Sequence, residues 1–78
     1  MSEVLLSDLE IGEKAVILNF KDEDLSLKLL EMGCLPGIEV EVVHFAPFGD
    51  PMAVKVSGYT LSMRKQEASE IIVEKLTK

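Results

Sequence analysis

The stretch that decides the fold is Leu29-Leu30-Glu31-Met32-Gly33-Cys34-Leu35-Pro36-Gly37. It predicts the end of a helix, a sharp turn and the start of a strand. Gly33 follows the last periodic apolar residue, where a left-handed residue closes a helix at little cost. The next residue, Cys34, would then pack back on Leu29. Because Pro36 cannot continue a helix and Gly37 completes a turn, we expect a helix before this stretch and mostly strands after it.

The helix that leads into this stretch is predicted at residues 23–32. Asp22 or Asp24 supplies an N-cap, and acidic side chains suit the positive end of a helix. Helical spacing puts three apolar residues on one face, and two more widen it: Leu25, Leu29 and Met32, with Leu27 and Leu30. This apolar surface is broader than a helix of this length needs for one core. Either the helix is wedged deep in the fold, or one flank of it is a docking surface.

Apolar and β-branched runs predict five short strands: Lys14–Phe20, Ile38–Phe45, Met52–Ser57, Tyr59–Met63 and Ile71–Val73. Gly58 separates the third and fourth strands and indicates a hairpin. Short turns are expected within residues 5–13 and 64–69. The pattern therefore predicts a mainly β fold, a small five-stranded antiparallel barrel with one inserted α-helix. With 78 residues, the chain is expected to form a single domain over residues 1–78.

The bulk composition excludes several classes of partner. The formal net charge is −6, from 14 acidic and 8 basic residues. Nucleic-acid binding depends on basic side chains that neutralise phosphates, so no nucleic-acid partner is expected, and an anionic membrane surface is disfavoured for the same reason. No apolar run approaches the roughly 20 residues of a membrane span, so no direct membrane insertion is expected. One cysteine and no signal pattern predict a cytoplasmic location.

Candidates for chemistry are few. Cys34 and His44 are the only cysteine and histidine, and they lie at opposite ends of one predicted strand, so no catalytic pair is expected. No glycine-rich phosphate motif is present, and no cofactor or resident metal is expected. The alternative is a transition-metal-binding protein, an iron chaperone or sensor. It would use His44, Cys34 and surface carboxylates such as Glu39, Glu41 and Asp50.

A turn-rich loop follows the second strand and reads Ala46-Pro47-Phe48-Gly49-Asp50-Pro51. Phe45, Phe48 and Met52 either cap the end of the barrel and pack internally, or Pro47 and Phe48 stand out and anchor a partner. The candidate protein-binding residues are therefore Leu27 and Leu30 on the helix, with Pro47, Phe48, Gly49, Asp50 and Pro51 in the loop.

These motifs, taken in order, resemble the ferrous iron transport protein A (FeoA) family. The resemblance covers the helix end Leu-Leu-Glu-Met-Gly with Leu-Pro-Gly after it, the loop at residues 46–51, and the segment Val-Lys-Val-Ser-Gly-Tyr. It extends to Met63-Arg64-Lys65-Gln66-Glu67-Ala68 before the last strand. Cys34 departs from the pattern, since Leu, Ile or Val is expected there, but a free cysteine often behaves as a small buried hydrophobe.

The resemblance implies an SH3-like five-stranded barrel with an inserted helix. It also implies a non-enzymatic cytosolic accessory of ferrous iron uptake. Such a protein would bind the cytoplasmic part of the ferrous iron permease, an inner-membrane protein with a GTPase domain, and modulate it. Self-association stays open, as does the direction of any effect on the permease.

Overall fold

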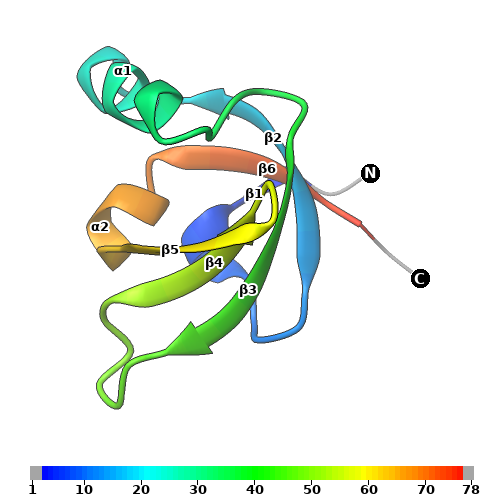
Figure 1. Cartoon of the computed structure of the whole chain (residues 1–78), viewed down its shortest axis with the longest axis vertical. Coiled ribbons are helices and arrows are strands. Elements are labelled where there is room, and N and C mark those ends of the chain that lie inside the picture. The colour runs from blue at the N-terminus through cyan, green and yellow to red at the C-terminus, as the bar shows by residue number, and fades with distance from the viewer. Residues whose placement is uncertain (1–2, 77–78) are drawn as a thin grey trace.

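Six strands form one antiparallel sheet that curves around the core (Figure 1). The computed structural model describes residues 3–76. Its elements are β1 (Glu3–Leu5), the 3-10 helix η1 (Leu6–Asp8), β2 (Lys14–Phe20), α1 (Glu23–Glu31), β3 (Glu39–Phe45), β4 (Met52–Val56), β5 (Tyr59–Met63), α2 (Lys65–Ala68) and β6 (Ile71–Lys75). The strands lie in the order β1-β6-β2-β3-β4-β5, and all neighbours are antiparallel.

The mainly β architecture is confirmed, but the sheet has six strands, where the sequence predicted five. The additional strand is β1, which pairs with β6 so that Val4 lies opposite Val73. Three residues are too few to show an alternating pattern, and the partner strand lies at the other end of the chain. The turns expected within 5–13 and 64–69 correspond to η1 and α2. The predicted single domain, 1–78, includes residues 1–2 and 77–78, which lie outside the described part.

The turn after α1 has the predicted geometry. Asp22 caps the helix N-terminus, where its carboxylate accepts a hydrogen bond from the Asp24 N–H. At the other end, Gly33 has a φ of +89°. The Gly33 N–H donates to the Leu30 carbonyl at 3.1 Å, and the Cys34 N–H donates to the Leu29 carbonyl at 2.9 Å. These two bonds form a Schellman motif, which satisfies the last carbonyls of the helix and sends the chain towards β3.

The core lies inside the curved sheet and follows the alternation of the strands. Its buried residues are Leu6, Leu9, Ala15, Ile17, Leu29, Cys34, Val40, Val42, Met52, Val54, Val56, Met63, Ala68, Ile71 and Val73. The pairing of β2 with β6 shifts register between Ile17 and Asn19, and that of β3 with β4 shifts between Val42 and His44. Such irregularities bend strands, which helps the sheet to curve.

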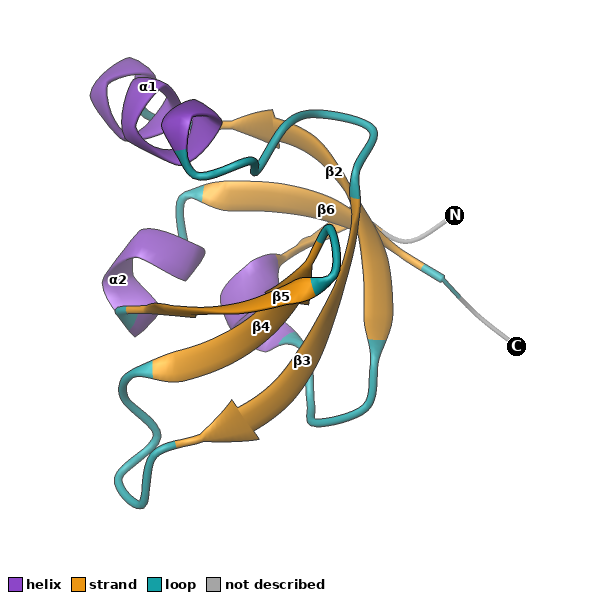
Figure 2. Cartoon of the chain, in the orientation of Figure 1, coloured by secondary structure: helices purple, strands orange, loops and turns teal. Residues whose placement is uncertain are grey.

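Helices cover the parts of the core that the sheet leaves open (Figure 2). The two short helices η1 and α2 contact each other, and η1 also contacts β6. α1 contacts β2 and sends Leu29 into the core, while Leu25 and Met32 pack against it in part. Within residues 3–76, no helix has the length and apolar character needed to cross a bilayer.

Candidate protein-binding surfaces

The loop between β3 and β4 presents its aromatic tip to solvent. It is closed at its base by the Ala46 N–H, which donates to the Pro51 carbonyl at 3.0 Å. The Gly49 N–H donates back to the Ala46 carbonyl at 2.7 Å, and Gly49 has a φ of +86° that favours glycine. Phe48 at the tip is 98% exposed. A large aromatic side chain so placed can anchor a partner without any rearrangement of the fold.

The sequence left two interpretations of the apolar residues around this loop, internal packing and exposure to a partner, and each applies to different residues. Met52 is buried in the core, and Phe45 packs against it in part, as expected for residues that cap the end of the barrel. Phe48 and the neighbouring Pro47 stand out, as expected for the other reading. The pattern of the sequence could not separate these residues, because all of them are apolar and flank the same turn.

Asp50 fixes this loop to α2. Its Oδ1 accepts a hydrogen bond from the Lys65 N–H at 3.0 Å, and its Oδ2 lies 3.6 Å from Arg64 Nε. A carboxylate at a helix N-terminus satisfies a backbone donor and favours the positive end of the helix. Asp50 therefore helps to hold the loop that presents Phe48, while Pro47 and Phe48 form its outer surface.

The second candidate surface is the outer flank of α1. Leu29 is 2% exposed and packs in the core, but Leu27 is 64% exposed and Leu30 is 38% exposed. The broad apolar stripe of the helix is therefore divided between a buried face and a flank open to solvent. Two leucines on one helix turn match the way in which amphipathic helices present anchors to a groove.

An ion pair links α1 to α2. Lys28 Nζ lies 2.8 Å from Glu67 Oε2, while Glu67 Oε1 accepts a hydrogen bond from the Arg64 N–H at 2.9 Å. The hydrogen bond from Lys28, supported by the Arg64 N–H, holds the pKa of the Glu67 carboxyl below its usual range. α2 is thus fastened to both candidate surfaces, to the loop through Asp50 and to α1 through Lys28.

Two further exposed apolar residues lie near the end of α1, and the sequence did not single them out. Tyr59 begins β5; it is half-exposed, and its hydroxyl lies against Gly33. A Cβ atom on Gly33 would come within 3.0 Å of that hydroxyl oxygen. Leu35, in the turn after α1, is also exposed. The position of Tyr59 beside a hairpin turn could have indicated its exposure, since the ends of strands are less enclosed than their centres.

The candidate metal ligands do not converge. Cys34 is 1% exposed, and burial raises the pKa of its thiol, which disfavours the thiolate that binds metals. His44 is exposed on β3 beside the loop. Among the carboxylates, Glu41 lies opposite Lys14 on β2 and Lys55 on β4, as in a solvated strand face. Across residues 3–76, no three His, Cys, Asp or Glu side chains are grouped as a metal site would require.

Comparisons with known proteins agree with this architecture. A family model described as the FeoA domain matches residues 4–75. The Fe(2+) transport protein A/Fe(2+) transporter FeoB fusion protein of Porphyromonas gingivalis is 37% identical over 70 residues, which make up 88% of this chain and 8% of that protein. The structure of a FeoA-like protein from Clostridium acetobutylicum is 35% identical, with a TM-score of 0.92, and the match covers 100% of this chain and 92% of that one.

A third comparison defines the class of fold. The crystal structure of Stenotrophomonas maltophilia FeoA complexed with zinc is described as that of a prokaryotic SH3 domain protein; it is 29% identical, has a TM-score of 0.80, and the match covers 91% of this chain and 89% of that one. The curved antiparallel sheet described above is thus an SH3-like fold. Since the family model spans most of the sequence, the chain belongs to the FeoA family.

Proposed function

We propose that this chain is a non-enzymatic accessory of ferrous iron uptake that binds the cytoplasmic part of a GTPase-containing ferrous iron permease and modulates it. The observation that carries this proposal is the Porphyromonas gingivalis relative, in which a segment similar to this chain is fused to the transporter FeoB. Fusion keeps two modules at a high effective concentration, which is useful when the modules act on each other. We place the complex of this chain and the permease at the cytoplasmic face of the membrane.

The exposed apolar residues support action by binding. We assign contact with the permease to Leu27 and Leu30 on α1 and to the loop residues Pro47 and Phe48, with Gly49, Asp50 and Pro51 shaping that loop. Exposed leucines and aromatics that the fold does not need are typical anchors of protein interfaces. Catalysis by the one thiol is disfavoured, because Cys34 is buried and its pKa is raised.

Modulation requires that the chain distinguish between states of the permease. A bound protein shifts a conformational equilibrium only if it has different affinities for the two conformations. A difference of about 1–3 kcal/mol is typical of such coupling. We propose that the chain binds one cytoplasmic conformation of the permease more tightly and so raises its population.

Calorimetry with the purified cytoplasmic part of the permease tests this proposal. We expect Leu30→Glu to lower the affinity by about a hundredfold, because it puts a charge into an apolar contact, and Phe48→Ala to lower it by about tenfold. Ile11→Glu is the matched control, since Ile11 is also an exposed apolar residue but lies in neither surface. Circular dichroism checks that each variant is folded.

Two outcomes would contradict the proposal. If wild-type protein does not bind the cytoplasmic part of the permease, the assigned partner is wrong. If it binds and both Leu30→Glu and Phe48→Ala keep full affinity, the assigned surfaces are wrong. A loss of affinity in Ile11→Glu as large as in Leu30→Glu would show that added negative charge, and not the α1 contact, is responsible.

A further inference from the structure

The two edge strands of the sheet are protected to very different degrees. β1 has three residues, includes Glu3 and runs directly into η1. β5 has five residues, Tyr59-Thr60-Leu61-Ser62-Met63, with neither a charged residue nor a proline. Natural edge strands are usually blunted by shortness, charge, proline or a bulge, because their unpaired backbone groups can bind another strand. β5 has none of these protective features, so nothing in its own sequence keeps another strand from pairing with its outer edge.

The register of the hairpin identifies the free backbone groups. β4 and β5 are joined by Ser57 and Gly58, with φ of 50° and 87°, so Val56 and Tyr59 form the closing pair. In such a hairpin the closing residues exchange both hydrogen bonds, and pairs then alternate. The N–H and C=O groups of Thr60 and Ser62 therefore point away from β4. Within residues 3–76, β4 is the one strand that pairs with β5, and no turn or loop backbone bonds to Thr60 or Ser62.

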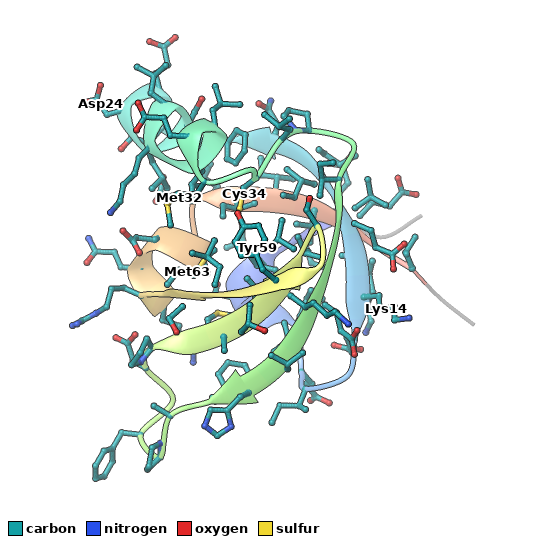
Figure 3. All side chains as sticks on the ribbon, viewed as in Figure 1. Lys14, Asp24, Met32, Cys34, Tyr59 and Met63 are labelled. Carbon is teal, nitrogen blue, oxygen red and sulfur yellow. The ribbon has the colours of Figure 1, made fainter. Side chains whose placement is uncertain are left out.

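Apolar side chains flank this edge on its inner side. In Figure 3 the labelled side chains of Met32, Cys34 and Tyr59 fall between α1 and β5. Leu61 packs against the core in part, and Tyr59 lies against Gly33. A strand added to β5 would place alternate residues opposite Tyr59, Leu61 and Met63, facing this apolar side. Its remaining residues would lie opposite Thr60 and Ser62, facing solvent.

Charge decides between two occupants of the edge, a second copy of this chain and a segment of another protein. The chain carries a net charge of −6, so two copies repel each other, whereas a basic segment is attracted. Next to β5, Arg64 lies 3.6 Å from Asp50, and Lys55 of β4, which is opposite Thr60, is also opposite Glu41 of β3. The Lys65 ammonium lies over the Phe45 ring, 6.0 Å from its centre, and keeps its positive charge. The overall charge of −6 therefore sets the long-range attraction of a basic segment, while close to the strand positive and negative side chains are mixed.

We infer that the outer edge of β5 binds an extended segment of another protein, with apolar residues at alternate positions and basic residues beside them. The segment adds a seventh strand and pairs with the backbone of Thr60 and Ser62. This mode of recognition takes affinity from main-chain hydrogen bonds and selectivity from alternate side chains. The partner segment is defined by its chemistry and need not belong to the permease.

The test uses three synthetic peptides and hydrogen exchange followed by NMR. The first is Lys-Val-Thr-Val-Thr-Val-Lys, in which valines face the apolar side and threonines pair with the free groups. The second has methyl groups on the two threonine amide nitrogens, which removes the donors and keeps every side chain. The third has glutamates in place of the lysines. We expect the first peptide to slow exchange at the Thr60 and Ser62 amides by at least about tenfold.

The two comparison peptides test separate parts of the inference. We expect the methylated peptide to give no protection and the acidic peptide to bind about tenfold more weakly at low salt, with a smaller difference at high salt. Thr60→Pro should abolish protection at Ser62, while the matched Thr60→Ala keeps it. Proline is tolerated here because the Thr60 N–H does not pair with β4. If Thr60→Pro does not fold, the methylated peptide still tests whether binding depends on main-chain hydrogen bonds.

Several results would overturn the inference. These are no protection at millimolar peptide, equal binding of the methylated peptide, or protection elsewhere and not at Thr60 and Ser62. Protection that rises with protein concentration alone, together with the mass of a dimer, would assign the edge to a second copy. Phe48→Ala is expected to keep peptide binding, so loss of permease binding with peptide binding intact separates this inference from the function proposed above.

Discussion

The flank of α1 and the loop at residues 46–51 both expose large apolar side chains, but the fold depends on them to different degrees. They lie at opposite ends of the molecule (Figure 1). On α1, exposed Leu27 lies two residues from Leu29, which is in the core. In the loop, Phe48 is almost fully exposed, and the bonds that shape the loop come from its backbone and from Asp50.

This difference decides what a substitution can report. A change at Phe48 removes surface that the fold does not bury, so it is expected to act on the proposed binding alone. A change at Leu30, which is partly covered, is expected to act on the proposed binding and also on how α1 packs. The loop is therefore the cleaner place to measure the proposed contact with a partner, because a substitution on the helix would change stability as well.

The largest effect on stability is expected from the buried leucine of α1. Leu29→Ala should lower the free energy of unfolding by about 3 kcal/mol, because it removes a fully buried side chain and leaves a cavity. Leu27→Ala, two residues away and exposed, should change it by less than about 0.5 kcal/mol. Urea denaturation of both variants measures the difference. Equal losses would show that α1 does not divide into a packed face and a free flank.

An intermediate effect is expected at Asp50, which holds the loop to α2. Asp50→Ala should cost about 1 kcal/mol, as is usual when the residue that caps a helix N-terminus is lost. Asp50→Asn is the matched control, since its amide oxygen still accepts from the Lys65 N–H. Phe48→Ala should leave the free energy of unfolding unchanged. Thermal denaturation distinguishes these variants. If Phe48→Ala is destabilised, Phe48 contributes to the stability of the fold, and this prediction is wrong.

Much of the fold was predictable because its signals are local. The helix was expected at 23–32 and is observed as Glu23–Glu31, and Gly33 adopts the left-handed conformation that its position required. In β3 and β4, valines alternate with polar residues in the sequence, and these alternating valines are the ones that the structure buries. β1 was not predicted, because it forms by pairing with β6 at the other end of the chain, and no local pattern reveals such a partner.

The exposure of individual apolar residues was harder to predict. Periodicity states which residues share a face but not how much of that face the rest of the molecule covers. The excess of apolar residues on one helix indicated a flank outside the core, and Leu27 and Leu30 are exposed on that flank. Their contact with a partner stays a prediction. Tyr59 is half-exposed, since its strand lies at the edge of the sheet, and the sequence does not reveal which strand is an edge.

The smallest effect concerns the ion pair that fastens α1. The pKa of Glu67 is lowered in the folded protein, first by the hydrogen bond from Lys28 and then by the Arg64 N–H. A lowered pKa stabilises the fold at pH values above the ordinary glutamate pKa of about 4.3, and this contribution is lost as the pH falls through the lowered value. Since Lys28 is largely exposed, Glu67→Gln should cost no more than about 0.5 kcal/mol at pH 7.

At pH 3 the difference between wild type and Glu67→Gln should shrink, because the protonated carboxyl and the amide are then both neutral. Urea denaturation at the two pH values measures this change, and subtracting the two proteins cancels every other titrating group. Lys28→Met should show the same dependence, since it removes the other half of the pair. A difference that persists unchanged at pH 3 would mean that the loss in Glu67→Gln does not come from the charge of Glu67. The attachment of α1 to α2 would then not depend on charge, while the loop, held through Asp50, would keep its own anchor.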